Sequence, residues 1–306
     1  MPANYVILTA AKDEEAYIGD VIRLVVRQTV KPLAWFIMDD GSSDRTAAIV
    51  ESFAAEYPFI HLQSAGARGG RNFGSQYKAV MAAYDLAKSL EFDFVCVQDA
   101  DQGPEREDYY ERMLHEFKRI PKLGMASGYV YERWRGTWEC RQGNSEDAVT
   151  GGMAFFRRIA FDGIGGYTPL RYGGSDTLAQ LELERAGWEI LTRPELHIYH
   201  YRPTCSAGGI WRGLFRAGFE DASLGYHPVF EIVRCLRRLL YRPILGSMVR
   251  FFGYLWWKAS GRKPLLGAET LAFVRKRQMI KLRRWVLPMG KRPGKSSSGV
   301  GVSTNV

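Results

Sequence analysis

The alternation of short apolar runs with helical patterns over the first hundred residues limits this chain to an α/β fold. Continuous apolar runs are typical of strands that are buried on both faces. They occupy residues 4–11, 34–40, 59–63 and 92–101. Helical spacing of apolar residues fills the intervals between them. Strands that alternate with helices of this length predict a doubly wound, mostly parallel sheet.

Acidic residues stand at two of the predicted strand ends. Asp39 and Asp40 close the second strand, and Asp99 and Asp101 close the fourth. Ligands bind such sheets at the carboxyl ends of strands. In an extended chain, residues two apart point to the same side, and two like charges are costly to desolvate without a cation between them. Asp99 and Asp101 therefore form either a solvated acidic turn or a divalent-cation site with hard oxygen ligands.

Charge is distributed unevenly along the 306 residues. Residues 1–225 carry 25 Lys/Arg and 31 Asp/Glu, whereas residues 226–306 carry 17 Lys/Arg and only two acids, Glu231 and Glu269. This asymmetry predicts an acidic catalytic body and a basic region that faces a polyanion. On charge alone, the polyanion is either anionic lipid or nucleic acid.

Residues 226–290 mix arginines with large apolar side chains. The least interrupted apolar part, 243–257, contains Arg250 and is shorter than the roughly 20 residues that a membrane-spanning helix needs. We interpret the region as basic amphipathic helices in a membrane interface, with Trp256 and Trp257 at headgroup level. The alternative is a helical lid packed on the main domain. Residues 291–306 have low complexity and are expected to be disordered.

The cysteines and the start of the chain indicate a compartment. None of the four cysteines forms a CxxC pair, and no signal peptide precedes the first apolar run. The expectation is reduced thiols in a cytoplasmic protein that lies peripherally on the inner face of the cell membrane.

Four motifs, quoted in chain order, are AAKDEEAYIGDVI, IMDDGSSDRTAAIV, GGRNFG and QDADQGPE. In order and spacing they resemble family 2 glycosyltransferases of the GT-A fold across about residues 4–200. The resemblance implies a GT-A domain over residues 1–225, with a Rossmann-like nucleotide half and an acceptor half. It implies inverting, Mg²⁺- or Mn²⁺-assisted transfer of a sugar from a nucleotide diphosphate sugar, in our interpretation UDP-linked, to a hydroxyl group. The basic C-terminal region favours a glycan or polyprenol-linked acceptor and no nucleic acid.

The resemblance also implies roles for individual residues. A carboxylate at Asp39 or Asp40 can accept a hydrogen bond from a pyrimidine ring N–H, and arginines among glycines can reach a diphosphate with forked donors. Glu14 is either part of this site or a simple charge at a helix N-terminus. The full set expected to bind the nucleotide sugar is Ala10, Ala11, Glu14, Asp39, Asp40, Arg68, Arg71, Asp99, Ala100 and Asp101. The expected metal ligands are Asp101, Asp99 and His200.

Inverting transfer needs a general base on the acceptor side. The resemblance assigns that role to Asp176, which could also serve as the N-cap of a helix starting near Thr177. Glu146 and Asp147 are lower-ranked alternatives. The expected acceptor-side residues are Gly151, Gly152 and Met153.

Two rival functions remain open at this stage. A sugar nucleotidyltransferase would carry a glycine-rich phosphate loop directly after the first strand, where this chain has TAAKDEE. An inactive GT-A module that docks on a membrane complex would not need the acids at 99, 101 and 176. The absence of a Gln-x-x-Arg-Trp motif after residue 176 favours addition of a single sugar over polymerisation.

Overall fold

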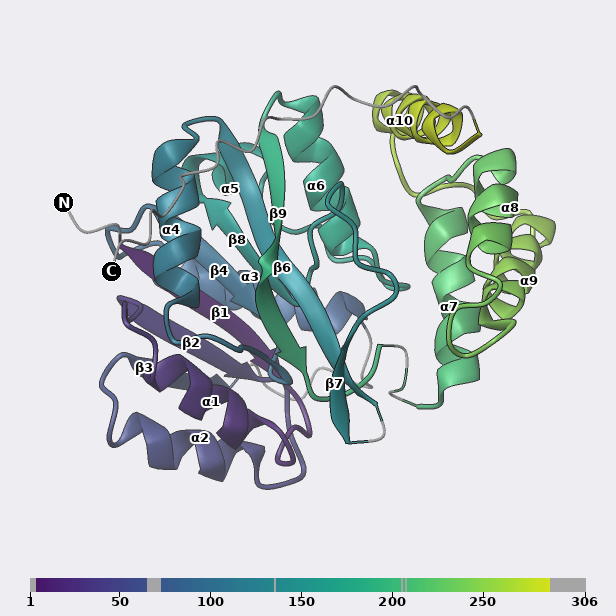
Figure 1. Cartoon of the computed structure of the whole chain (residues 1–306). Coiled ribbons are helices and arrows are strands. Elements are labelled where there is room, and N and C mark those ends of the chain that lie inside the picture. Colours follow the sequence, from purple (N-terminus) through teal and green to yellow (C-terminus); the bar gives the residue numbers. More distant parts are fainter. Residues whose placement is uncertain (1–3, 65–72, 135, 205, 207, 287–306) are drawn as a thin grey trace, which may run out of the picture.

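A single mixed sheet organises the computed structural model, which describes residues 4–64, 73–134, 136–204, 206 and 208–286 (Figure 1). The strands run in the order β3-β2-β1-β4-β8-β6-β9-β5, with β7 paired to β6. Their bounds are β1 Tyr5–Ala11, β2 Ala34–Asp39, β3 Ile60–Ser64, β4 Phe94–Gln98, β5 Gln102–Pro104, β6 Leu123–Trp134, β7 Thr137–Cys140, β8 Met153–Arg157 and β9 Glu189–His200.

The first half of the sheet is parallel, and the second half is mixed. β3, β2, β1 and β4 all run parallel, and in this register Ala11 lies opposite Asp39. The predicted α/β class and the four predicted strands are confirmed. In the second half, β8 runs antiparallel to both β4 and β6, while β6 and β9 are parallel. The switch in direction at β8 brings residues 151–153 beside the end of β4.

Helices cover both faces of the sheet. On one face, α1 (Ile18–Val26), α2 (Thr46–Ala54) and α4 (Tyr109–Arg119) bury their apolar sides in one core cluster. On the other face, α3 (Phe73–Ala87), α5 (Arg158–Gly163) and α6 (Ser175–Arg185) pack in a second cluster. The helical spacing seen in the sequence is confirmed in α1, where Ile18, Val21, Ile22 and Val25 are all buried. The two clusters hold the strand ends, and with them the acidic residues, in fixed positions.

Four helices form a group beside the sheet: α7 (Ile210–Ser223), α8 (Pro228–Arg237), α9 (Gly246–Ala259) and α10 (Ala268–Val286) (Figure 1). Glycines let α7 and α9 approach each other closely. A Cβ atom on Gly218 would lie 2.0 Å from the carbonyl oxygen of Arg250, and one on Gly253 would lie 2.0 Å from that of Phe215. No side chain larger than hydrogen fits at either position.

A buried ion network ties α7, α8 and α9 together. Asp221 accepts hydrogen bonds from Arg250 Nε at 2.5 Å and Nη2 at 2.8 Å. Arg234 pairs with Asp221 and also contacts Glu231, with 2.6 Å between Nη2 and Oε2. Arg234 and Arg250 therefore point into the protein. Both belong to the region that was interpreted from the sequence as facing a membrane. Burial of these charges is tolerated because each is paired.

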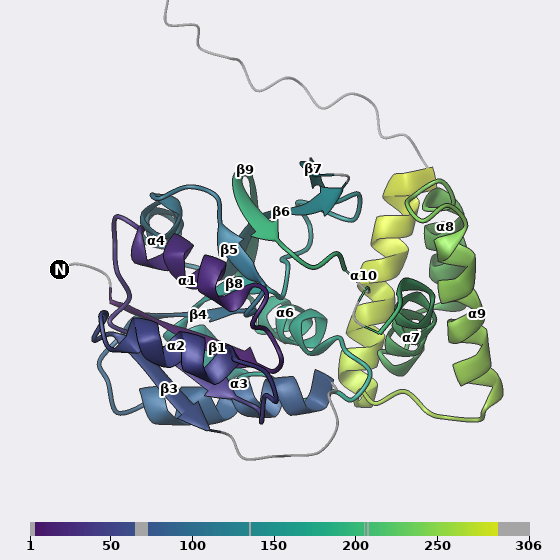
Figure 2. The ribbon, with the colours of Figure 1, turned by 90° about the horizontal axis from the view of Figure 1, so that it is seen from below.

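The helix group also packs on the sheet domain. Figure 2 shows α10 beside α6, with α9 farther out. Thr270 donates a hydrogen bond to Glu182, and Arg277 pairs with Glu184. Among the described residues, no helix is both long enough and apolar enough to cross a bilayer.

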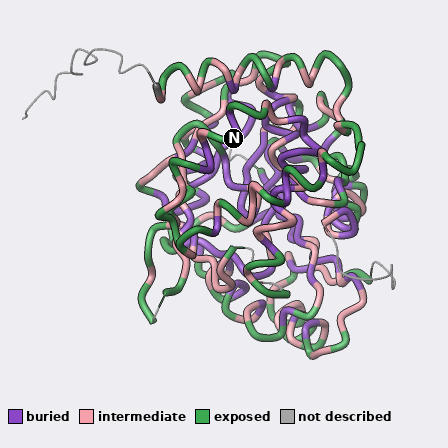
Figure 3. Tube along the Cα trace, turned by 90° about the vertical axis from the view of Figure 1, so that its right-hand side faces the viewer, coloured by how far each residue is buried: buried purple, intermediate pink, exposed green. Residues whose placement is uncertain are grey.

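The two adjacent tryptophans of α9 differ sharply in exposure. Trp257 is only 2% exposed and packs with Tyr254 and Ala222, whereas Trp256 is 67% exposed. The prediction that both indoles lie at headgroup level is therefore wrong for Trp257, because neighbours on a helix are about 100° apart around the axis. Figure 3 views the molecule from the side of the helix group, where exposed residues follow the outer turns of the helices.

We expect Gly253→Ala to destabilise the protein by about 2 kcal/mol or more, although alanine favours a helix by up to about 1 kcal/mol. The reason is that the new methyl group must push α7 away from α9. Thermal unfolding followed by circular dichroism measures the effect. Gly267→Ala is the matched control, since nothing lies within 4 Å of its Cβ position. Equal melting temperatures for the two variants would contradict the close packing.

Candidate active site

Asp99 lies directly after β4, where Gln76, Gln102 and Gly152 contact it. Asp99 Oδ1 accepts a hydrogen bond from Gln76 Nε2 at 2.8 Å, and Oδ2 accepts one from Gln102 Nε2 at 3.3 Å. The backbone N–H of Asp99 donates to the carbonyl of Gly152 at 2.8 Å. A Cβ atom on Gly152 would collide with the Gln102 amide. A glycine at 152 is thus needed for Gln102 to reach Asp99.

The carboxylate of Asp99 sits in a strongly negative environment. Burial raises its pKa, and the neighbouring Asp101 adds to the shift. Asp176 and Glu14 also raise the pKa of Asp99, while His200 lowers it. A cation bound here would remove this repulsion, as expected of a carboxylate pair that shares a divalent ion.

Asp176 lies in the first turn of α6 and faces the same region. Its Oδ2 lies within 2.3 Å of the position that a Cβ atom on Gly151 would take. Burial raises the pKa of Asp176, although the nearby backbone N–H groups of Thr177 and Gly151 lower it. The helix begins at Ser175 with Gly174 as its N-cap, so the N-cap role proposed for Asp176 is wrong. Asp176 thus lies against Gly151 and Asp99 against Gly152, so both aspartates contact one short turn.

Asp101 is surrounded by cationic side chains from β9 and the residues after it. His200 Nε2 lies 3.7 Å from Asp101 Oδ1, and Arg202 Nη1 lies 3.8 Å from Oδ2. Burial opposes a charge on His200, but the carboxylates of Asp101 and Glu132 outweigh it and raise the pKa of His200 to about 9. The guanidinium of Arg202 is held by a bidentate pair with the buried Glu14.

Several residues that the sequence predicted for nucleotide binding collect at the ends of β1 and β2. Asp39 accepts hydrogen bonds from the Ser42 N–H at 3.2 and 3.3 Å and so closes the turn after β2. Asp40 is 4% exposed, its N–H donates to the Ala11 carbonyl, and its Oδ1 has no hydrogen-bond partner among the described residues. Ala10 is partly exposed beside them, while Ala11 is buried. Asp40 thus offers a buried acceptor, the group that a base N–H requires.

The sequence of residues 6–175, more than half of the chain, matches the profile of the family described as "Glycosyl transferase family 2". The chain is a family 2 glycosyltransferase. Curated relatives support this assignment over shorter stretches. The poly-beta-1,6-N-acetyl-D-glucosamine synthase of Staphylococcus aureus is 31% identical over 121 residues, which are 40% of this chain and 27% of the relative. The beta-monoglucosyldiacylglycerol synthase of Synechocystis is 26% identical over 241 residues, covering 68% of this chain and 48% of the relative. The matches thus span less than half the length of either curated relative.

Solved structures share the fold of the glycosyltransferase. The mannosyltransferase PcManGT from Pyrobaculum calidifontis, solved with GDP-Man and Mn²⁺, superposes with a TM-score of 0.56 at 14% identity, covering 93% of this chain and 81% of that one. S. aureus TarS residues 1–349, solved with UDP, gives a TM-score of 0.51 at 13% identity over 78% of this chain and 72% of that one. These likenesses establish the GT-A fold that the sequence motifs predicted.

The donor set of the glycosyltransferase fits a divalent metal ion. Asp99 and Asp101 supply carboxylate oxygens, and Mg²⁺ commonly uses one or two carboxylates together with substrate phosphates. His200 could add its imidazole only in the neutral form, so a metal ion there would have to displace the proton that Asp101 and Glu132 favour. In the part of the chain that the structure describes, no three His, Cys, Asp or Glu side chains form a metal-binding group by themselves. Phosphate oxygens of a bound donor would therefore have to complete the coordination.

Three further charged residues near the candidate site were not predicted from the sequence because they come from distant segments. Arg202, two residues after β9, lies beside Asp101, and Glu132 on β6 contacts His200. Glu220 on α7 lies against Gly173 and Gly174, directly before Asp176, with Oε2 3.0 Å from the Cβ position of Gly173. Burial raises the pKa of Glu220, and Asp221 and Asp176 add to the shift. The one sequence signal for these residues is Arg202, which follows His200 by two positions.

Some predicted residues of the glycosyltransferase do not reach the site with their side chains. The side chains of Met153 and Ala100 are buried in the hydrophobic core. Arg68 and Arg71 lie outside the described residues. Glu146 and Asp147 are exposed on the loop before β8, and Asp147 lies 3.8 Å from Lys281.

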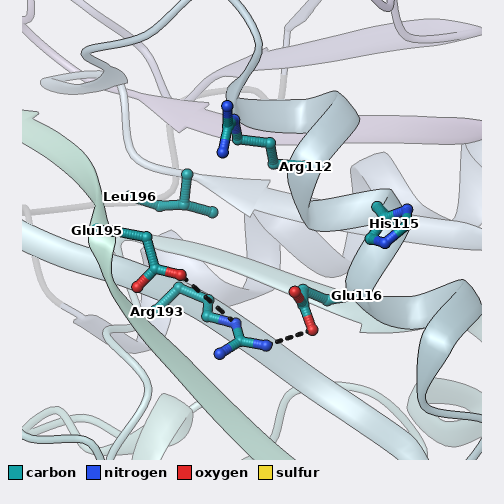
Figure 4. A pocket seen from close by; sticks show the side chains of 6 residues that line it. All are labelled: Arg112, His115, Glu116, Arg193, Glu195 and Leu196. Carbon is teal, nitrogen blue, oxygen red and sulfur yellow. Dashed lines mark hydrogen bonds and ion pairs between the residues drawn. The ribbon is translucent and has the colours of Figure 1, made fainter. Parts of the chain in front are cut away.

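A separate small pocket of about 120 Å³ lies between α4 and β9 (Figure 4). Its charges pair with one another: Arg193 contacts Glu116 at 2.6 Å and Glu195 at 3.8 Å. The residues that line it include none of those predicted for the site. The pocket is therefore a surface ion-pair cluster and not part of the active site.

Proposed function

We propose that this glycosyltransferase moves a sugar from a UDP-linked donor to a hydroxyl group of a glycan or polyprenol-linked acceptor, with inversion. The observation that carries the proposal is the meeting of Asp99 and Asp176 across the Gly151–Gly152 turn. One carboxylate lies where a donor diphosphate ends, and the other faces the acceptor side. This is the arrangement that in-line displacement at a sugar carbon requires.

Each residue then has a defined task. Asp40 accepts a hydrogen bond from the base, and the charge of Arg202 lies beside the diphosphate. Asp101, with Asp99 and His200, would hold Mg²⁺ or Mn²⁺, which neutralises the charge that develops on the leaving nucleotide. Asp176 takes the proton from the attacking hydroxyl, and its raised pKa makes the carboxylate a stronger base than an exposed aspartate.

Names of similar proteins support the choice of donor and acceptor. TarS has been solved with UDP-GlcNAc, and PcManGT with GDP-Man and Mn²⁺. The Synechocystis relative is named for the synthesis of a glucosylated diacylglycerol. A lipid-borne acceptor would place the enzyme on the inner face of the cell membrane, consistent with the basic residues after position 226.

A screen of UDP- and GDP-sugars for metal-dependent hydrolysis tests the proposal. The expected result is release of UDP from one UDP-sugar in Mg²⁺ or Mn²⁺, with little release in excess chelator. Release of pyrophosphate from a nucleoside triphosphate and a sugar phosphate would instead support a nucleotidyltransferase. Failure of every donor to bind or react would support an inactive module.

A further inference from the structure

The outer surface of α8 and α9 has the reverse of the polarity that water-facing helices show. In α8, Glu231 is fully buried and Arg234 is 8% exposed, whereas Leu236 is 63% exposed. In α9, Trp256 is 67% exposed, while Arg250 turns inward to Asp221. Of the eighteen large apolar side chains that are exposed in the described part of the chain, eleven fall within residues 229–256. Such a concentration of exposed apolar side chains marks an interaction surface.

These side chains form one continuous surface, which we call the outer apolar patch. It runs from α8 through the connecting loop to α9. Its most exposed members are Ile232, Leu236, Leu240, Ile244, Phe252 and Trp256. Between the helices the patch is hollowed by a groove of about 150 Å³ with an entirely apolar lining, which includes Cys235 and Phe251. Leu240 is 79% exposed and Ile244 is 63% exposed, so the loop is the most prominent part of the patch.

Cationic side chains border the patch. Arg237, beside Leu236, stacks on Trp285 at 4.9 Å, which places the end of α10 next to the end of α8. Arg237, Arg283 and Arg284 are exposed, and none of the three forms an ion pair with a carboxylate among the described residues. Residues 226–286 contain fourteen Lys/Arg and two acids, one of which is the buried Glu231. The surface is therefore apolar at its centre and positive at its edge.

We propose that the outer apolar patch inserts into the headgroup region of an anionic bilayer, with these arginines over the lipid phosphates. This combination of apolar area and basic flanks is the one that interfacial helices use. Nucleic acid would contact the arginines but leave the apolar side chains of the patch exposed to water. A second copy of the chain would cover the leucines but bring like charges together.

The patch is joined through Arg242 to β6 and β7, and β6 carries Glu132 beside His200 of the candidate site. Arg242, in the loop of the patch, donates its N–H to Gln142 Oε1 at 2.7 Å and pairs with Glu139 at 2.9 Å. Its guanidinium stacks over Trp134 at 5.1 Å, two residues from Glu132. The docked enzyme would hold the segment 132–142 at the lipid surface. The inference rests on the proposed function only for the nature of the acceptor.

Co-sedimentation with vesicles, without donor, tests docking independently of catalysis. Wild-type protein is expected to bind phosphatidylglycerol-containing vesicles and to bind phosphatidylcholine vesicles less. Leu240→Ser with Ile244→Ser should lower the partition coefficient about 100-fold, and Phe252→Ser with Trp256→Ser should act in the same way. Each change of Arg237, Arg283 or Arg284 to Gln should lower the partition coefficient about fivefold at low salt and by less at high salt. Ile159→Ser is the matched control, since Ile159 is 66% exposed on α5.

Melting curves and sedimentation velocity accompany the binding assay. Unchanged melting temperatures for the serine variants would show that the exposed side chains do not hold the fold together. Wild-type protein that stays in the supernatant with anionic vesicles at low salt would overturn the proposal. So would a wild-type dimer that the serine changes dissociate while vesicle binding is absent, because the patch would then be a subunit interface. Donor hydrolysis should be equal in wild type and patch variants, so loss of docking and loss of catalysis remain distinguishable.

Discussion

Replacement of Asp101 by asparagine is expected to lower sugar transfer by about 10²–10⁴-fold and to weaken donor binding in Mg²⁺ or Mn²⁺. A neutral amide is a poorer ligand for a hard cation than a carboxylate, and the cation contributes several kcal/mol to stabilising the leaving group. The fold should survive the change, because Arg202 keeps its bidentate pair with Glu14. Steady-state transfer rates and calorimetric donor binding, each across a metal titration, measure the two effects.

Asp85→Asn is a suitable control for the Asp101 experiment. Asp85 is an exposed residue of α3 whose pair with Lys88 lies on the surface, so its loss should leave the rate unchanged. If the wild-type enzyme worked equally well in excess chelator and in metal, the metal role of Asp101 would be wrong. Loss of activity in Asp101→Asn would then have to come from the contacts of Asp101 with His200 and Arg202.

Asp176→Asn is expected to reduce the transfer rate at saturating donor by about 10²–10⁴-fold, the usual contribution of a general base. Asparagine has the shape of aspartate and can still accept from the N–H groups of Thr177 and Gly151, so the first turn of α6 should stay in place. Donor affinity should hardly change, since the carboxylate acts on the acceptor. Single-turnover transfer and donor binding measured on the same preparation separate the two quantities.

Glu220→Gln is the informative comparison for the base, because Glu220 is the other carboxylate with a raised pKa beside the start of α6. We expect a much smaller loss of rate than in Asp176→Asn. A large loss in Glu220→Gln with an active Asp176→Asn would transfer the role of base to Glu220. Collapse of donor binding in Asp176→Asn would place Asp176 on the donor side instead.

The parallel half of the fold and the core of the site could be predicted because their signals are local. Two of the four apolar runs end at acids, and parallel strands bring those ends to one edge, so the placement of Asp40 and Asp99 follows from pattern alone. The turn at Gly151 and Gly152 was placed on the acceptor side by resemblance, but its close contact with Asp99 depends on β8 reversing direction. No local pattern in residues 150–157 specifies that reversal.

The helix group shows why the rest could not be predicted. Sequence periodicity shows that α8 has two different faces, but it does not say which face turns inward. The usual rule buries the apolar face. Here Asp221, supplied by α7, makes burial of Arg234 and Arg250 possible, and the apolar face is left outside. Arg202 and Glu14 meet across 188 positions of sequence, a separation that no short motif spans.

The contacts of α10 have a practical consequence for preparing the enzyme. Shortening the chain at residue 225 would strip Thr270 and Arg277 from α6, and it would leave Asp221 without Arg234 and Arg250. The face of α7 that packs against α9 would also be exposed to water. Serine substitutions at Leu240 and Ile244 remove exposed apolar surface and leave all of these pairs intact. A detergent-free sample for crystallisation is therefore better sought by substituting these two exposed residues than by truncation.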